Sequence, residues 1–188
     1  MIDNRGGGDL RVTLFKLAIT IMAIVSLAPL NAQDDTDPCG PPTDKKIVKM
    51  LEDAAKAKDA VERHQKLKAA LEIDGECAEC LFRLGLSAYR IGKESGKGYE
   101  ASIRYLEQLQ AKCPQYHSDV PYHLGTMYYA QDKFAEAARA FEAFLRFPTE
   151  DPTKVSKDYD KKYKDVEEVM LRKRRKRMEG KEAFNNLR

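Results

Sequence analysis

The four cysteines are the residues best suited to chemistry in this sequence. Cys77 and Cys80 form a CxxC pair, which is the spacing of redox-active dithiols and of half of many zinc sites. A thioredoxin-like site needs that pair after a strand in a βαβ unit, but here the pair opens a helical pattern. Zinc would need a second close Cys or His pair, and the nearest histidine, His117, stands alone after Cys113. We therefore expect structural disulfides, with unpaired thiols or redox work by Cys77 and Cys80 as alternatives, and no metal.

The pairing of the cysteines stays open at this point, because Cys39, Cys77, Cys80 and Cys113 allow three connectivities. Two disulfides are possible and one is expected. On the chain-entropy estimate, a bridge that closes the loop between Cys77 and Cys80 contributes about 2 kcal/mol, whereas a bridge from either of them to Cys113 contributes nearly 4. The sequence therefore favours the longer link.

Other catalytic patterns are weak. The segment from Gly92 to Gly98 resembles a phosphate-binding loop, but its spacing is one residue short, Gly98 stands where Ser or Thr is required, and a helix precedes it instead of a strand. No Ser, His and Asp arrangement and no pair of carboxylates has a spacing typical of a hydrolase, so His64, His117 and His123 are interpreted as ordinary side chains. We expect no enzyme activity and no cofactor.

Charge is nearly balanced, with 33 Lys and Arg against 30 Asp and Glu in 188 residues. A net charge of +3 gives no global field of the kind on which nucleic-acid affinity depends, so no nucleic-acid partner is expected. The local exception is the basic run Arg172–Arg177. It is interpreted first as the solvated end of a helix, and alternatively as a peripheral contact with anionic lipid, at about 1 kcal/mol for each basic residue.

The N-terminus carries the one strongly apolar run. Leu17–Leu30 spans about 14 residues, or about 21 Å of helix, which is shorter than the hydrocarbon core of a bilayer, and Pro29 would end it. Basic residues precede the run, and a small-residue box ends at Ala32. We expect a cleaved signal peptide over residues 1–32 and an exported linker over 33–45, with an uncleaved anchor as the alternative and no transmembrane span after cleavage.

From Ile47 to Phe147, apolar residues recur at spacings of three and four, which predicts an all-α fold. Two segments in this region align with each other, Leu81–Tyr89 and Pro121–Tyr129, and each carries Leu-Gly with a tyrosine about one turn later. Each is followed by a second amphipathic segment that ends before a proline. The pattern predicts repeated helical hairpins.

These hairpins resemble the tetratricopeptide repeat, a helical hairpin of 34 residues with an L-G-x2-Y and A-x3-F signature. The resemblance covers about three repeats over residues 46–148, of which the first is atypical, followed by a charged helix and tail over 153–188 that caps the stack through an apolar stripe. The earlier full copy has four extra residues, which are expected in its hairpin loop. The repeat-packing positions are Leu84, Gly85, Ala101 and Tyr105 in the earlier copy, and Leu124, Gly125, Tyr128, Ala137 and Phe141 in the later one.

The resemblance also implies a concave groove that binds a partner. In tetratricopeptide repeats the first helix of each hairpin lines this groove, and aromatic and Arg side chains are common anchors of protein interfaces. The alternative interpretation is that some of these side chains pack in the core. The candidate groove residues are Phe82, Leu86, Tyr89, Arg90, Tyr122, Thr126 and Tyr129.

A wider resemblance extends over roughly residues 39 to 170. Short stretches such as Ala70–Asp74, Cys113–Asp119 and Ser156–Lys162 are similar to the N-terminal repeat region of Gram-negative cell-envelope proteins. In those proteins the repeats precede a β-propeller and an OmpA-like peptidoglycan-binding domain. The resemblance implies a non-enzymatic periplasmic scaffold that binds an envelope protein, with outer-membrane association left open. This chain ends at Arg188, before either domain, so it is expected to be a stand-alone adaptor or the front part of a longer protein.

Overall fold

The computed structural model describes residues 37–96 and 98–185, so the expected signal peptide, residues 1–32, and the start of the linker lie outside the described residues. The described residues form seven α-helices and one short 3₁₀ helix, with no β-strand, which confirms the all-α prediction. The helices are α2 (Lys45–Lys56), α3 (Ala60–Ile73), α4 (Ala78–Ser95), α5 (Glu100–Lys112), α6 (Asp119–Ala130), α7 (Phe134–Leu145) and α8 (Tyr159–Asn185), with the 3₁₀ helix at Pro152–Lys154.

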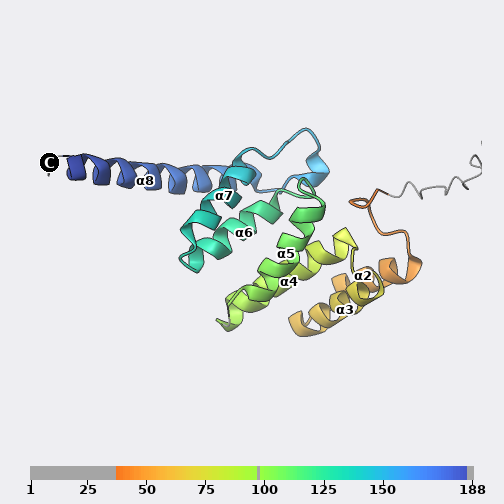
Figure 1. The fold of residues 1–188 in the computed structure, drawn as a ribbon. Helices are drawn as coiled ribbons and strands as arrows, with labels where there is room; N and C mark the ends of the chain where they lie inside the picture. The colour runs from red at the N-terminus through yellow and green to blue at the C-terminus, as the bar shows by residue number, and fades with distance from the viewer. Residues whose placement is uncertain (1–36, 97, 186–188) are drawn as a thin grey trace, which may run out of the picture. The chain divides into compact units, whose positions relative to one another are not determined.

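Successive helices pack as hairpins. Helix α2 pairs with α3, α4 with α5, and α6 with α7, and these hairpins follow one another along the described chain (Figure 1). Neighbouring hairpins meet through α3 against α4 and through α5 against α6, and α8 then packs against α7. Within the described residues, no helix combines the length and the apolar character needed to cross a membrane.

Short polar side chains set where the first helices begin. The Asp44 carboxylate accepts hydrogen bonds from the backbone N–H groups of Lys46 and Ile47 at the start of α2. Asp59 does the same for Glu62 at the start of α3, at 2.7 Å. These bonds satisfy N–H groups that have no partner within the helix. Helix α4 ends at Gly96, whose φ of 66° is the left-handed conformation that glycine adopts at little cost.

Two apolar clusters form the core, and α4 contributes to both. One cluster joins α2 and α3 to one side of α4 and includes Ile47, Leu67 and Leu84. The other runs from the opposite side of α4 through α5, α6 and α7 to α8, and includes Leu81 and Phe144. Helix α4 therefore connects the first hairpin to the rest of the described chain.

Each of the two full hairpins, α4–α5 and α6–α7, has one close contact between its two helices. A Cβ added at Gly85 would lie 2.4 Å from Cδ2 of Leu106, and a Cβ added at Gly125 would lie 2.4 Å from Cδ1 of Phe141. Ala137 is buried beside the second contact. Glycine therefore lets the two helices of each hairpin approach closely, as the sequence predicted for both glycines.

The predicted register of α5 is wrong by one position. Leu106, not Tyr105, meets Gly85, and Ser102 is buried where Ala101 was expected, whereas Ala101 is exposed. Gly85 and Leu106 are 21 residues apart, while Gly125 and Phe141 are 16 apart, so the earlier copy carries five extra residues instead of four. A shift of one residue turns a helical side chain by about 100°, which moves Ala101 out of the contact.

The extra residues lengthen a helix more than they lengthen the loop. Helix α4 has 18 residues against 12 in α6, and Gly92, which was expected in the loop, is buried in α4. A Cβ at Gly92 would lie 2.3 Å from the carbonyl oxygen of Gly98, so the chain returns close against this last part of the helix.

Helix α8 covers the open side of the last hairpin with its apolar stripe. Val166 and Met170 are buried, and Tyr159 and Tyr163 are partly buried against the same cluster. The Tyr159 hydroxyl donates a hydrogen bond to the carbonyl oxygen of Phe144, at 3.1 Å.

Candidate interaction surface

One face of α4 carries the best candidate site. Phe82, Leu86 and Tyr89 follow one another at spacings of four and three, so they lie along one side of the helix. All three are partly buried, and Arg90 beside them is exposed. Three cavities open along this side of α4, and each is completed by a different neighbour.

The first cavity lies between α4 and the first hairpin. It has a volume of about 190 Å³, and its lining is apolar apart from arginine side chains and Ser87. Leu86 and Arg90 line it from α4, while Leu51 of α2 and Leu67 of α3 lie on the other walls.

The second cavity, of about 630 Å³, lies between α4 and α6. Leu86, Tyr89 and Arg90 line it from α4, so three of the predicted groove residues are brought together here. Asp119 and His123 line it from α6. The ring centroids of Tyr89 and His123 are 4.5 Å apart, which makes this the closest ring contact between the two helices on this face.

The third cavity, of about 830 Å³, lies at the start of α4. Phe82 lines it together with Tyr116 and His117 from the segment before α6, and its ring centroid is 5.5 Å from that of Tyr116 and 4.9 Å from that of His117. Glu79 lies in the same lining and accepts a hydrogen bond from the Tyr116 hydroxyl. Burial and this bond raise the pKa of Tyr116, so its hydroxyl stays protonated at neutral pH.

The groove residues predicted on α6 do not line these three cavities. Tyr122 packs against Phe144, with ring centroids 5.4 Å apart, and the Lys162 ammonium of α8 lies 4.9 Å from the centroid of its ring. The Thr126 hydroxyl donates to the carbonyl oxygen of Tyr122 at 2.9 Å. Tyr129 is exposed and lies in a separate cavity with α7 and α8. Residues of α8 lie beside both tyrosines: the Lys162 ammonium is over the Tyr122 ring, and Val169 and Met170 share the cavity of Tyr129.

His123 is a lining residue that sequence reasoning missed. Its pKa is lowered from 6.5 to about 4, mainly by burial and also by Lys162, while Asp119 acts in the opposite direction. The ring is therefore neutral at neutral pH, and its Nδ1 finds no hydrogen-bond partner in the described part of the chain. A lone histidine within an aromatic helix gives no sequence signal for this position.

Lys162 fixes α8 to the start of α6. Its ammonium nitrogen lies 2.8 Å from Oδ1 of Asp119 and 2.7 Å from Oδ1 of Asp158, and it also donates to the Ser156 hydroxyl at 2.8 Å. Burial alone would lower the pKa of Lys162, but the hydrogen bonds to the two aspartates outweigh burial and raise the pKa. The ammonium is thus held charged beside the α6 face.

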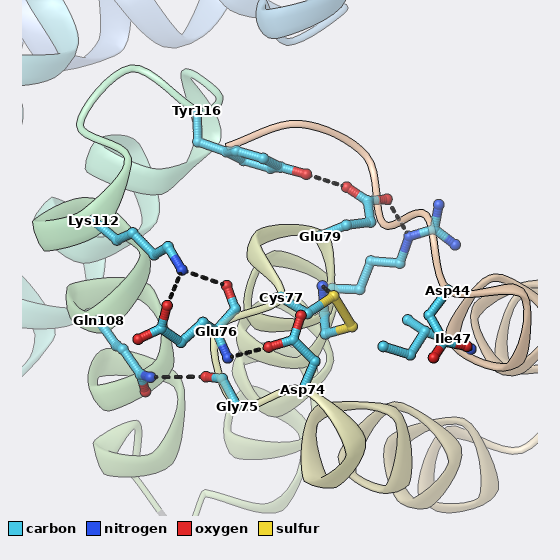
Figure 2. The surroundings of a disulfide bond; sticks show 12 residues. Asp44, Ile47, Asp74, Gly75, Glu76, Cys77, Glu79, Gln108, Lys112 and Tyr116 are labelled. Carbon is cyan, nitrogen blue, oxygen red and sulfur yellow. Dashed lines mark hydrogen bonds and ion pairs between the residues drawn. A yellow bond between two sulfur atoms is a disulfide. The ribbon is translucent and has the colours of Figure 1, made fainter. Parts of the chain in front are cut away.

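The CxxC pair forms a disulfide at the start of α4 (Figure 2). Cys77 is the residue that caps the helix, and its Sγ accepts from the backbone N–H of Cys80 at 3.1 Å. Cys77 is 5% exposed and Cys80 is 0% exposed, and both pack in the apolar cluster of the first hairpin. The pair is therefore shielded from exchange partners in this state.

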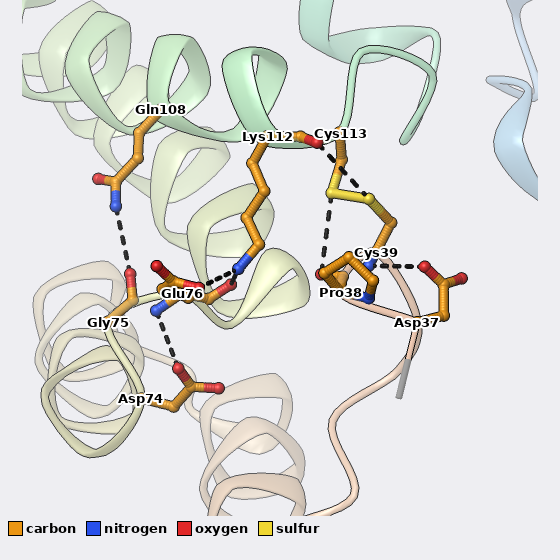
Figure 3. Close-up of polar contacts among 9 residues, drawn as sticks. All are labelled: Asp37, Pro38, Cys39, Asp74, Gly75, Glu76, Gln108, Lys112 and Cys113. Atoms are coloured by element: carbon orange, nitrogen blue, oxygen red, sulfur yellow. Dashed lines mark hydrogen bonds and ion pairs between the residues drawn. A yellow bond between two sulfur atoms is a disulfide. The ribbon is translucent and has the colours of Figure 1, made fainter. Parts of the chain in front are cut away.

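The second disulfide joins Cys39 to Cys113, the residue that ends α5 (Figure 3). The sequence-based preference for a link from Cys77 or Cys80 to Cys113 is wrong. The physical reason is that Cys77 and Cys80 pack in the cluster of the first hairpin, whereas Cys113 packs in the other cluster. Beside this bridge, Lys112 donates to the Glu76 carbonyl oxygen at 3.1 Å and to its Oε2 at 2.7 Å, so the end of α5 is also held to the turn before α4.

The arrangement of side chains on the α4 face is suited to binding. Across residues 37–96 and 98–185, no group of three or more His, Cys, Asp and Glu side chains is placed to hold a metal ion. What the α4 face presents is a row of apolar and aromatic side chains with an arginine at its edge, which is the composition of protein-binding surfaces. A comparison of the chain with known proteins found no matching family model, no matching curated protein and no matching solved structure.

Proposed function

We propose that this chain is an exported, non-enzymatic adaptor of the tetratricopeptide type, and that the α4 face binds a segment of a partner protein. The observation that carries the proposal is that three cavities open along one helix and are lined by its partly buried side chains: Phe82 lines one, Tyr89 lines another, and Leu86 lines two. Preformed cavities of this kind accept apolar anchor side chains of a partner at little cost in reorganisation. The glycine contacts within the α4–α5 and α6–α7 hairpins support the repeat type.

Two features support an envelope location for this adaptor. The apolar run before Ala32 resembles a secretory signal, and both cysteine pairs lie at disulfide distance, which suits an oxidising compartment such as the periplasm. The sequence resemblance to envelope proteins makes another envelope protein the proposed partner class. N-terminal sequencing of the mature protein tests whether the chain is exported with cleavage of a signal peptide. A start at Gln33 supports this proposal, and a start at Met1 contradicts it.

Site-specific photocrosslinking in the native cells tests the binding face. A photoreactive phenylalanine analogue replaces Leu86, which lines two of the cavities, and as a control it replaces the exposed Arg104 of α5. We expect a discrete adduct from position 86 and none of the same mass from position 104. A second substitution, Tyr89→Ser, should reduce the adduct at least fivefold while the melting temperature of the protein stays within a few degrees. Equal adducts from both positions would rule out a specific α4 site.

One observation favours thiol-disulfide exchange as a second candidate function. Cys77 caps α4, and the N-terminus of a helix is a common position for reactive cysteines. The burial of both sulfur atoms opposes this function. An insulin-reduction assay separates the redox function from the adaptor function. Turnover that is lost in Cys77→Ser would support the redox function. A rate no higher than that of buffer alone would favour the adaptor function.

A further inference from the structure

A fourth cavity lies away from the α4 face, between the end of α6, the start of α7 and the middle of α8. Its volume is about 410 Å³. The floor is apolar, and it includes Tyr129, Phe134 and Val169. Tyr129 is 51% exposed and Phe134 is 46% exposed, and their rings meet edge to face with centroids 5.6 Å apart. Large aromatic side chains that stay this exposed in a hollow are candidates for contact with a ligand.

One wall of this cavity is cationic. Arg172, Lys173 and Lys176 of α8 line it, and no carboxylate does. Arg172 pairs with Glu168 one turn earlier, but within the described residues neither lysine forms an ion pair. The ammonium of Lys173 instead donates to the carbonyl oxygen of Phe134, at 2.9 Å, which holds it at the mouth of the cavity. The wall is thus left with positive charge that nothing in the described chain neutralises.

We propose that this cavity binds an acidic peptide segment that carries one large apolar side chain. The apolar side chain enters between Phe134 and Val169, and the flanking carboxylates pair with the cationic wall that includes Arg172 and Lys176. Charge complementarity carries the choice of ligand, since an apolar floor beside unpaired ammonium groups favours an anionic chain with an apolar anchor. The volume is sufficient for one such anchor. The site shares no lining residue with the α4 face, so it does not depend on the function proposed above.

A peptide suits this geometry better than a bilayer does. Consecutive residues of a helix are separated by about 100° around its axis, so Arg174 and Arg175 lie on other sides of α8 than Lys173 and Lys176. A helix that lies on a membrane would gather its cations beside one protruding apolar face. Here the apolar side chains line a cavity between helices. An extended peptide can insert a side chain into this cavity, whereas the flat surface of a membrane cannot enter it.

Fluorescence anisotropy of a labelled probe peptide tests the proposal with the full mature chain. The probe is a nonapeptide of alternating Asp and Glu with a central Phe, and its matched control carries Ser in place of Phe. We expect Kd for the Ser peptide to be at least about tenfold weaker than for the Phe peptide, because the anchor is lost. A rise in salt from 50 to 300 mM should also weaken binding several-fold, because the ion pairs are exposed.

Paired charge removals then locate the site. R172Q/K176Q removes two cations from the cavity wall and should weaken Kd for the Phe peptide about tenfold or more. R174Q/R175Q removes two cations from the same helix outside the wall and should change Kd less than about twofold. Equal weakening by both variants would mean nonspecific attraction and would overturn the proposal, as would equal affinity for the Phe and Ser peptides or the absence of binding.

Two other occupants appear as distinct outcomes of the same experiment. If the probe fails to bind while vesicles of phosphatidylglycerol and phosphatidylcholine pellet the protein, and R172Q/K176Q abolishes that pelleting, the occupant is a membrane and the peptide site is wrong. If sedimentation of the protein alone shows a dimer that F134Q dissociates, and the probe does not compete, the occupant is a second copy of the chain, which also overturns it.

Discussion

Ser102 on α5 donates its hydroxyl hydrogen to the backbone carbonyl oxygen of Gly85 on α4, across a distance of 2.8 Å. Both residues are buried. Because Gly85 lies in the middle of α4, the Ser102 hydroxyl is an additional donor to a carbonyl group that belongs to a helix. The hydrogen bond therefore links α4 to α5. In the later hairpin the equivalent position is Ala137, which packs without such a bond.

Ser102→Ala should therefore lower the stability of the protein only slightly. The substitution keeps the small volume that the close approach at Gly85 requires, and it removes one buried donor together with its own need for a partner. We expect the free energy of unfolding, measured by urea denaturation, to fall by less than about 1.5 kcal/mol. Ser102→Leu should cost more than about 2 kcal/mol, because the added carbons have no space. A larger loss in the Ala variant than in the Leu variant would contradict this account of the contact.

Gly125→Ala should lower the stability of the protein. The steric clash of the added Cβ should outweigh the gain in helix propensity that a Gly to Ala substitution normally gives. The added Cβ would lie 2.4 Å and 2.5 Å from two carbons of the Phe141 ring, which is buried and cannot move aside freely. We expect a loss of about 1–3 kcal/mol in urea denaturation, despite a gain of about 1 kcal/mol in helix propensity. Gly75→Ala is the matched control, because nothing lies within 4 Å of its added Cβ, and it should change stability by less than about 0.5 kcal/mol.

The two disulfides should differ in what they contribute. Cys39 and Cys113 are 74 positions apart, whereas Cys77 and Cys80 are 3 apart, and the chain-entropy estimate gives about 4 kcal/mol for the first bridge and about 2 for the second. We expect C39S/C113S to lower the free energy of unfolding more than C77S/C80S does. Peptide mapping of the unreduced protein checks the pairing itself, and a Cys77–Cys113 or Cys80–Cys113 peptide would contradict it.

Lys162→Gln should loosen α8 from the rest of the described chain. The substitution leaves Asp119 without its closest cation and removes the charge over the Tyr122 ring. We expect faster amide hydrogen exchange over residues 159–170 and a loss of about 1–3 kcal/mol in stability, because a partly buried carboxylate is left unpaired. Lys161→Gln, an exposed neighbour on the same helix, should leave both measurements unchanged.

Acidification should destabilise the protein through His123. The pKa of its imidazole is about 4 in the folded chain against 6.5 as the ordinary value, so the unfolded chain takes up the proton first as the pH falls. The contribution of neutral His123 is therefore complete above pH 6.5 and is lost as the pH falls towards 4, at about 1.4 kcal/mol for each pKa unit, or about 3 kcal/mol in all. Chemical denaturation at several pH values measures the slope.

His123→Gln should flatten that slope between pH 6.5 and 4. His64→Gln is the control, because His64 is less buried and also has a lowered pKa, so its removal should flatten the slope less. Asp119 and Lys162 both face His123 and are unchanged in the variant, so the difference in slope between the two proteins reports on the imidazole. An unchanged slope in His123→Gln would contradict the account.

The fold class was predictable because it depends on patterns that are local in the chain. Apolar spacing of three and four gives the helices, and Leu-Gly pairs identify the first helix of each full hairpin. Gly125, Ala137 and Phe141 pack together as their spacing predicts, because the later hairpin has a short loop that leaves little choice of register.

The register of α5 was not predictable in the same way. Ala101 and Tyr105 satisfy the repeat signature as letters, but the buried pair is Ser102 and Leu106. The signature has no information on how far α4 continues past Gly92, and the length of that helix decides which residues of α5 face it.

The candidate site likewise has a part that local patterns predict and a part that they do not. Phe82, Leu86 and Tyr89 each line a cavity, and their common side of one helix follows from their spacing alone. Tyr122 and Tyr129 have equivalent places on α6, but their surroundings depend on where α8 packs, which no local pattern encodes. Tyr122 lies beneath the Lys162 ammonium, whereas Tyr129 lines a cavity with residues of α7 and α8.

The Cys39–Cys113 bridge changes how the repeated hairpins come apart. In a stack held by neighbour contacts alone, an end hairpin can detach while the others stay folded. Here the bridge encloses α2, α3, α4 and α5 in one covalent ring, so a protease cut at any single bond within that ring leaves both fragments attached to each other. The chain would thus survive a first cut as one molecule, and the nick would appear in electrophoresis only after reduction.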